Sequence, residues 1–193
     1  MKFLEISLIG FVLFFSFIIS FYYGHQGLMP LDDLQNFNSG YRILTGDFPF
    51  RDYYSITGPF LDISQGYIYK IFGISWQSFV LHASIMNCLY SISVFLFLKS
   101  LEFKTKDCFF YSLSAGLLMY APSGNPTVEH NSLILSLIAT FFFIISLKEN
   151  KKGYLFASIL IFFISFFTKQ VPTSYFVIFC IIIYFSTIFS EVK

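Results

Sequence analysis

Long apolar runs, separated by short polar segments, dominate the hydropathy pattern of this chain. The runs at residues 3–23 and 76–98 each supply the roughly 20 apolar residues that a helix needs to cross about 30 Å of hydrocarbon. Four further runs follow, and the one at 108–121 is the shortest: residues 108–121, 131–147, 154–168 and 175–189. The pattern predicts an all-α integral membrane protein with about six transmembrane helices, a single membrane domain over residues 1–193. The first run is too long for a signal-peptide core and has no small-residue cleavage site, so we expect a retained anchor.

The segment between the first two runs, residues 24–75, has a pattern of its own. Side chains recur at helical spacing in its first half, and Gly46 offers a stop: Leu31, Leu34, Asn38, Tyr41 and Leu44. Gly58-Pro59 then interrupts the chain before a second amphipathic stretch at residues 60–72, which ends at Gly73. Both stretches are typical of helices that lie in the membrane interface rather than across it.

Composition and charge narrow the class of protein further. Apolar residues make up 56% of the chain and charged residues 12%, against about a quarter charged in soluble domains. The net charge of +1 gives no reason to expect a nucleic-acid partner. The cysteines lie within or beside apolar runs, so we expect them to pack in the membrane and to form neither a disulfide framework nor a metal site: Cys88, Cys108 and Cys180.

The distribution of basic residues predicts the orientation. With a cytoplasmic N-terminus, the inner segments hold eight basic residues: Lys2, Lys99, Lys104, Lys106, Lys148, Lys151, Lys152 and Lys193. The outer side then holds four: Arg42, Arg51, Lys70 and Lys169. Six spans with both termini cytoplasmic satisfy this bias, and they place residues 24–75 on the outer side.

The outer segment holds the first candidate chemistry. Asp32-Asp33 stands at the expected start of a helix, where one carboxylate suffices as a cap and the second could act as a base or bind a sugar hydroxyl. We favour Asp33 as the base, because Asp32 is better placed as the cap. Arg51 either pairs with the adjacent Asp52 or recognises a phosphate.

Two further clusters lie near the outer ends of later spans. Glu129 and His130 stand at the start of the fourth span, either as ordinary polar residues near water or as part of a site. Lys169-Gln170 interrupts an apolar stretch, and Lys169 either extends to water or binds an anion. We predict that Arg51 and Lys169 converge on one anionic group beside Asp32-Asp33. No third ligand has metal-site spacing, so no metal or other cofactor is identified.

Several of these motifs occur together in a recognisable order: Asp32-Asp33, residues 40–53, Gly58-Pro59, residues 71–73 and residues 168–170. In this order and topology the chain resembles bacterial GT-C glycosyltransferases of the protein mannosyltransferase and lipid A aminoarabinose transferase branch, over residues 1 to about 175. Such enzymes use a polyprenyl-phosphate-linked sugar donor in the inner membrane, with a periplasmic active site. Family members generally have more spans, so the resemblance implies an N-terminal part, with a missing C-terminal segment or a separate C-terminal partner.

The resemblance also implies roles for individual residues. Asp33 or Asp32 would be the catalytic carboxylate, and Arg51 and Lys169 would hold the lipid phosphate. The substrate-binding residues would be Asp52, Tyr53, Glu129, His130 and Gln170. The alternative is a non-enzymatic membrane component, such as a transporter or flippase fragment or an accessory subunit. The absence of an internal repeat and of charges at mid-membrane depth favours the enzyme.

Overall fold

The computed structural model describes residues 3–55, 57–120 and 124–191, with side chains to residue 187. This part of the chain is helical and forms no strand; its helices are α1 (Phe3–Tyr23), α2 (Asp32–Leu44), α3 (Phe60–Phe72), α4 (Trp76–Ser100), α5 (Thr105–Leu118), α6 (Val128–Glu149), α7 (Lys152–Phe166) and α8 (Gln170–Glu191). The two helices predicted at the interface are α2 and α3, and their bounds agree with the apolar spacing and with Gly46 and Gly73.

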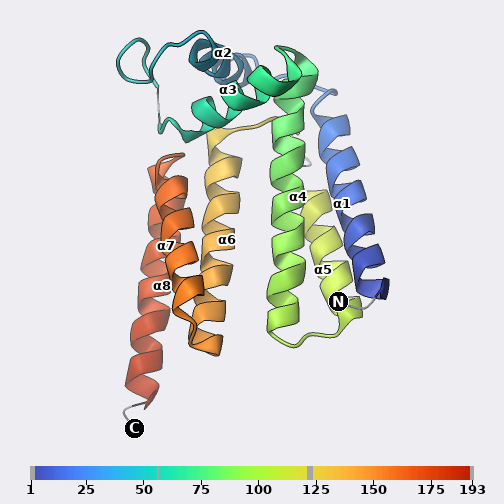
Figure 1. Cartoon of the computed structure of the whole chain (residues 1–193), viewed down its shortest axis with the longest axis vertical. Helices are drawn as coiled ribbons and strands as arrows, with labels where there is room; N and C mark the ends of the chain where they lie inside the picture. The colour runs from blue at the N-terminus through green and yellow to red at the C-terminus, as the bar shows by residue number, and fades with distance from the viewer. Residues whose placement is uncertain (1–2, 56, 121–123, 192–193) are drawn as a thin grey trace.

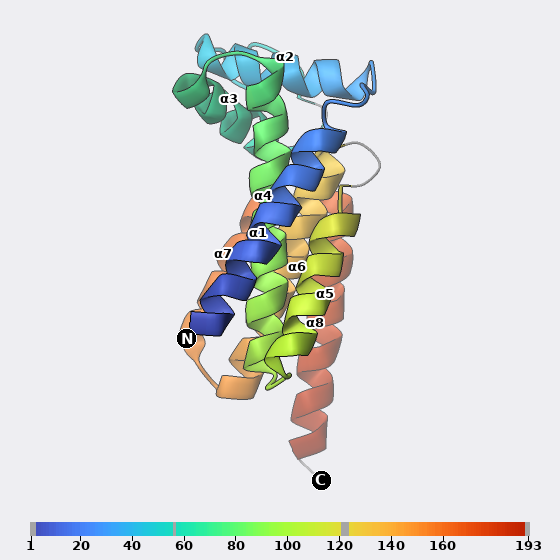
Figure 2. The same cartoon turned by 90° about the vertical axis from the view of Figure 1, so that its right-hand side faces the viewer.

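Six of the helices run side by side, and the other two lie across one end of them. Figures 1 and 2 show α2 and α3 crossing above the ends of α1, α4 and α6. We call residues 24–75, which include both crossing helices, the cap layer. The first turn of α1 and the last turn of α8 both lie at the end away from the cap layer (Figure 1).

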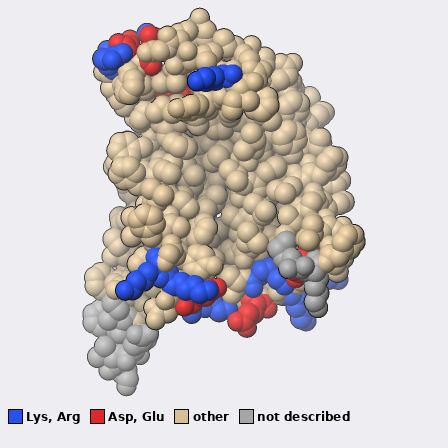
Figure 3. Space-filling view, in the orientation of Figure 1, with Lys and Arg blue, Asp and Glu red and all other residues tan. Residues whose placement is uncertain are grey.

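Four of the described helices are long and apolar enough to cross a membrane: α1, α4, α6 and the part of α8 up to Thr187. Helices α5 and α7 have 14 and 15 residues, which give about 21 and 23 Å of rise against about 30 Å of hydrocarbon. On the face shown in Figure 3, the charged residues gather on the cap layer and at the opposite end, with an uncharged band between them. This architecture is that of a multi-pass helical membrane protein, in which four of the six predicted spans are long and apolar enough to cross a membrane.

Helices α1, α4 and α5 are joined by polar groups buried between them. The amide of Asn87 in α4 donates to the backbone oxygens of Ser16 in α1 (2.8 Å) and Gly116 in α5 (2.7 Å). The hydroxyl of Ser16 donates to that of Ser91 at 2.8 Å. A Cβ atom at Gly116 would overlap both hydroxyls, so this glycine permits the close approach of the three helices.

Helices α6, α7 and α8 meet around a cluster of buried hydroxyl groups. Ser132 and Ser136 from α6, Ser165 from α7 and Thr173 from α8 lie within hydrogen-bond distance of one another, the shortest pair being Ser165 and Thr173 at 2.7 Å. Ser132 and Thr173 also donate to the backbone oxygen of Lys169, each at 2.9 Å. The turn between α7 and α8 is therefore held in place from two helices.

The cap layer is attached to this turn by direct backbone contacts. The amide of Gly58 donates to the oxygen of Thr168, and that of Phe60 donates to the oxygen of Phe167, both at 3.1 Å. A Cβ atom on Gly58 would overlap the carbonyl group of Phe167, so only glycine allows this approach. Two of the sequence motifs, Gly58-Pro59 and residues 168–170, thus meet in the fold.

A second attachment joins the cap layer to the start of α4. Phe37 of α2 packs against Tyr69 of α3, with ring centroids 5.2 Å apart, and against Trp76 and Phe79 of α4 at 6.3 and 5.6 Å. The indole nitrogen of Trp76 donates to the backbone oxygen of Gly24 at 2.8 Å. The cap layer is therefore fixed at both sides, above the cavity described next.

Candidate functional site

A polar cavity of about 110 Å³ lies beneath α2, where the cap layer meets α6 and the turn between α7 and α8. Helix α2 contributes residues spaced three and four apart, which places them on one face of the helix. The cavity is lined by Asp32, Gln35, Asn36, Ser39, Ser55, Thr57, Asp62, Val128, Glu129 and Lys169. Three carboxyl groups thus face one ammonium group, and amides and hydroxyls make up most of the remaining lining.

Lys169 and Glu129 form an ion pair at the edge of this cavity. Lys169 belongs to the turn that Ser132 and Thr173 hold, and Glu129 lies in the first turn of α6. The Lys169 side chain is 26% exposed and that of Glu129 is 57% exposed, so solvent screens the pair and its contribution to stability is small. The sequence left two alternatives for Lys169, and the structure adds a third, a carboxylate partner.

Asp33 is fully buried and is held by two donors. Its Oδ2 atom accepts from the backbone amide of Met29 at 2.7 Å and from the side-chain amide of Asn125 at 2.8 Å. Its Oδ1 atom is buried without a hydrogen-bond partner among the described residues. Burial raises the pKa of Asp33, and the negative charge of Asp32 raises it further. The two hydrogen bonds lower it but do not offset the burial. Asp33 therefore ties α2 to the loop before α6.

Asp32 has the opposite environment, because it is exposed and lines the cavity. The residue at the N-cap of α2 is Leu31, and no side chain caps this helix. The expectation that Asp32 serves as the cap is therefore wrong, and the reason for preferring Asp33 as the base falls with it. Of the two aspartates, Asp32 is the one that a ligand in the cavity can reach.

Asp62 is a residue of this cavity to which the sequence assigned no role. It lies in the first turn of α3 and is 4% exposed. Its Oδ2 atom accepts from the hydroxyls of Tyr53 at 2.8 Å and Ser55 at 3.2 Å. Burial raises the pKa of Asp62 despite these two hydrogen bonds. The sequence signal was available, because Asp62 shares the buried stripe of α3 with Gln65 and Tyr69.

Arg51 does not line the cavity, and the predicted convergence of Arg51 with Lys169 is not observed. The guanidinium of Arg51 pairs with Asp52 at 2.7 Å and is 70% exposed. Asp52 also accepts from the backbone amide of Phe48 at 2.7 Å. The hydrogen bond from Arg51, and to a lesser extent that from Phe48, lowers the pKa of Asp52. Arg42 pairs with Asp47 at 2.8 Å and also donates to the backbone oxygen of Asp52 at 3.1 Å. This loop satisfies its own charges, as in the simpler of the two sequence interpretations.

The remaining predicted residues lie around the cavity rather than in its lining. Tyr53 contacts it indirectly, through its hydrogen bond to Asp62. The His130 ring packs against Tyr120 with centroids 4.8 Å apart, and its Nδ1 atom lies 3.1 Å from the hydroxyl of Thr127. Gln170 begins α8 with an exposed side chain. The structure thus brings together Asp32, Glu129 and Lys169 from the predicted set.

This arrangement suits the recognition of hydroxyl groups. Carboxylates and amide oxygens accept from hydroxyls, while the amides and the ammonium group of Lys169 donate. In the described part of the chain, no group of three or more His, Cys, Asp or Glu side chains is arranged to hold a metal ion. The exposed carboxylate of Asp32 can take a proton from a bound hydroxyl.

The fold and this cavity define a multi-pass helical membrane protein with a polar site at one end of its helix bundle. No protein family, no curated protein and no solved structure matches this chain.

Proposed function

We propose that this protein transfers a sugar from a polyprenyl-phosphate-linked donor to an acceptor hydroxyl, in the cavity beneath α2. The observation that carries the proposal is the meeting of Asp32, Asp62, Glu129 and Lys169 at one polar cavity in the cap layer. A sugar presents many hydroxyl groups, and three carboxyl groups with flanking amides offer matching acceptors. The order of motifs that resembles GT-C glycosyltransferases supports the same reaction.

In the proposed reaction Asp32 is the general base. Its carboxylate takes the proton of the acceptor hydroxyl while the acceptor oxygen bonds to the anomeric carbon of the donor sugar. The bond between that carbon and the phosphate oxygen breaks, and the electron pair leaves with the lipid phosphate. The ammonium group of Lys169 stabilises the charge that develops on this phosphate, which requires it to exchange its Glu129 partner for the leaving group.

The proposal includes a membrane orientation. We place the cap layer on the periplasmic side of a bacterial inner membrane, with both termini cytoplasmic and with α5 and α7 completing six spans. Basic residues at the helix ends away from the cap layer support this orientation by the positive-inside rule: Lys99, Lys104, Lys106, Lys148, Lys151 and Lys152.

Substitution of Asp32 tests the reaction. The full chain would be reconstituted in liposomes with radiolabelled polyprenyl-phosphate sugars and a membrane extract as the source of acceptors, and label leaving the lipid phase would be measured. Loss of a general base costs about 10²–10⁴-fold, so we expect Asp32→Asn to lower transfer by at least about 100-fold. Asp107→Asn, the same change in the first turn of α5, is the matched control and should retain the wild-type rate. Equal rates for the two variants would refute the assignment of Asp32.

A non-enzymatic role is the second candidate, and one observation favours it. The ion pair of Lys169 with Glu129 already neutralises the one cation of the cavity, whose volume of about 110 Å³ is below the roughly 300 Å³ of ordinary ligand pockets. If Lys169 serves only to hold the turn between α7 and α8 against α6, its ion pair with Glu129 is sufficient. Wild-type protein that releases label from none of the donors tested would favour this second candidate.

A further inference from the structure

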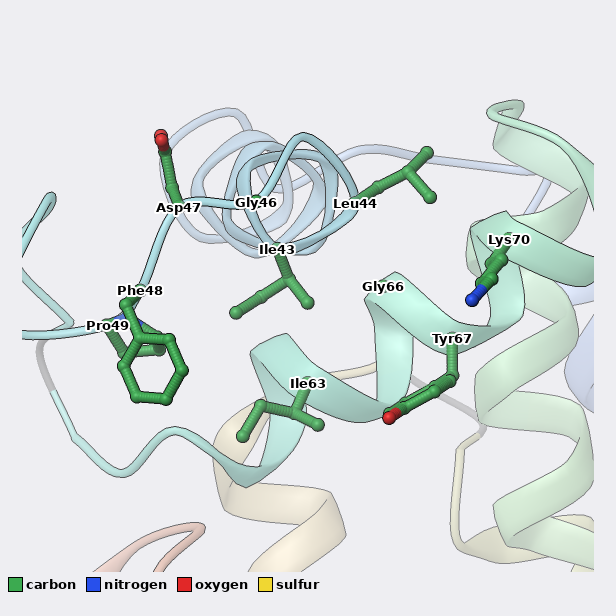
Figure 4. Close-up of a pocket in the computed structure, with 10 residues that line it drawn as sticks. All are labelled: Ile43, Leu44, Gly46, Asp47, Phe48, Pro49, Ile63, Gly66, Tyr67 and Lys70. Carbon is green, nitrogen blue, oxygen red and sulfur yellow. The ribbon is translucent and has the colours of Figure 1, made fainter.

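A second cavity, separate from the polar one, lies between α2 and α3. Its volume is about 510 Å³, within the range of ordinary ligand pockets. Figure 4 shows it bounded above by the last turn of α2, below by α3 and at one end by the loop that follows α2. We call it the interhelix groove; it is lined by Ile43, Leu44, Gly46, Asp47, Phe48, Pro49, Ile63, Gly66, Tyr67 and Lys70.

The walls of the interhelix groove are apolar along most of its length. Ile43 extends from α2 toward α3, Ile63 lies on the α3 side, Phe48 lies at one end and Lys70 at the other (Figure 4). Ile63 and Lys70 are seven residues apart on α3, which corresponds to roughly 10 Å along the helix. The groove therefore has the form of a short apolar trough with one positive charge at its end.

That charge has no protein partner in the described part of the chain. Of the four basic residues on the cap side, Arg42, Arg51 and Lys169 each form an ion pair, and Lys70 forms none with any described residue. The one carboxylate in the groove lining, Asp47, already pairs with Arg42 at 2.8 Å. In Figure 4 the amino group of Lys70 points back along α3 toward Tyr67 and Gly66, over the groove.

The groove also lies beside surface that suits the membrane interface. Large apolar side chains around the end of α3 are exposed, among them Tyr67 (62%), Ile71 (71%) and Phe72 (58%). Aromatic and apolar residues beside a lysine are typical of the depth at which lipid headgroups meet the acyl chains. The lysine end of the groove therefore lies beside surface of the kind that contacts lipid.

From these observations we infer that the interhelix groove binds an anionic glycerophospholipid. One acyl chain lies between Ile43 and Ile63, and the phosphate contacts the ammonium group of Lys70. A free phosphate would meet only one exposed lysine, a contact worth little in water, whereas the apolar walls give a lipid a second source of binding energy. A zwitterionic lipid would fill the walls equally well but would gain less from Lys70.

Fluorescence quenching by brominated lipids tests this inference at the groove itself. Trp76 is the single tryptophan of the chain, so Tyr67→Trp combined with Trp76→Phe places one reporter on the groove wall. Phenylalanine keeps an aromatic ring beside Phe37 and Phe79 and gives up only the hydrogen bond to Gly24. The full chain would be reconstituted with increasing fractions of phosphatidylglycerol or phosphatidylcholine carrying the same dibrominated acyl chains. One lysine beside an anionic lipid favours it by about fivefold, so half-maximal quenching should need about fivefold less phosphatidylglycerol.

Substitution of the lysine separates the charge from the apolar walls. Lys70→Gln in the reporter protein should bring the two quenching curves together, and Lys106→Gln, at the other end of the bundle, should leave them apart. Inorganic phosphate at constant ionic strength should displace neither lipid. Coincident curves in the reporter protein, separate curves in Lys70→Gln, or displacement by inorganic phosphate would each overturn the inference.

Discussion

Substitution of Gly58 by alanine provides a direct test of how the cap layer is attached. The new Cβ atom would overlap the carbonyl of Phe167 and lie 2.9 Å from its Cα atom. Real Cβ atoms essentially never come closer than 3.0 Å to such a neighbour. The obstacle is backbone rather than a flexible side chain, so the cap layer must move away from the turn between α7 and α8. The two 3.1 Å hydrogen bonds made by Gly58 and Phe60 would then be lost or lengthened.

The size of the effect follows from these contacts. Two backbone hydrogen bonds contribute about 0.5–1.5 kcal/mol each, and overpacking adds about 1–3 kcal/mol. We expect a loss of about 2–6 kcal/mol, or roughly 4–24 °C in Tm for a chain of this size. The measurement is thermal unfolding of the purified protein in detergent, followed by limited proteolysis, which should cleave the cap layer sooner in Gly58→Ala.

Gly10 supplies the matched control for this prediction. It lies within α1, and a Cβ atom there would meet nothing within 4 Å. Gly10→Ala should leave Tm unchanged or raise it slightly, since alanine is the better helix former. If Gly58→Ala unfolds at the same temperature as Gly10→Ala, the backbone contact does not hold the cap layer and the reasoning fails.

Three further predictions follow from other features of the structure. Gly116→Ala should cost about 1–3 kcal/mol in detergent unfolding, because its Cβ atom would displace the Ser16 hydroxyl from between the helices. Asp62→Asn should raise Tm near pH 7, and the gain should shrink as the pH is lowered toward about 4. Burial raises the pKa of Asp62, so the folded protein holds the proton of this carboxyl group more tightly than the unfolded chain does. The stability of the wild-type protein therefore falls as the pH rises above 3.8, the ordinary pKa of an aspartate. For the orientation, single cysteines at positions 51, 104 and 151, in a chain without the native ones, should react with an impermeant reagent from outside only at position 51.

Each of these three predictions has an outcome that would count against it. Unchanged unfolding of Gly116→Ala would mean that the three helices can separate at no cost. A stability gain in Asp62→Asn that is constant with pH would show that the carboxyl group does not change its protonation on folding. Reaction at position 151 from outside would remove α5 as a span and reverse the orientation of the chain beyond it.

The helices could be predicted from the sequence because their signals are local. Apolar residues at helical spacing, followed by Gly46, delimit α2, and Gly58-Pro59 with Gly73 delimits α3. The chain adopts positive φ at both Gly46 and Gly73, a conformation that favours glycine and explains why the helices end there. The number of membrane spans depends less on local signals. Helices α5 and α7 are shorter than the hydrocarbon thickness, so their depth depends on the helices beside them.

The candidate site was predictable only in part, because its geometry depends on contacts between distant residues. The buried carboxylate of Asp33 accepts a hydrogen bond from Asn125, 92 residues further along the chain, and no local pattern indicates this pair. Arg51 shows the reverse, since its immediate neighbour Asp52 is its partner. The sequence therefore contains this pair as one of the two interpretations of Arg51.

The hydroxyl cluster between α6, α7 and α8 has a consequence for the way these helices associate. Serine and threonine can donate to a carbonyl of their own helix, as Thr173 does to Lys169 at 2.9 Å and Thr140 does to Ser136 at 2.8 Å. A hydroxyl bonded in this way leaves no donor unsatisfied, so it costs far less in an apolar environment than a charged side chain does. Ser132, Ser136 and Ser165 bond between helices instead, so side chains that a single helix can satisfy also join α6 to its neighbours.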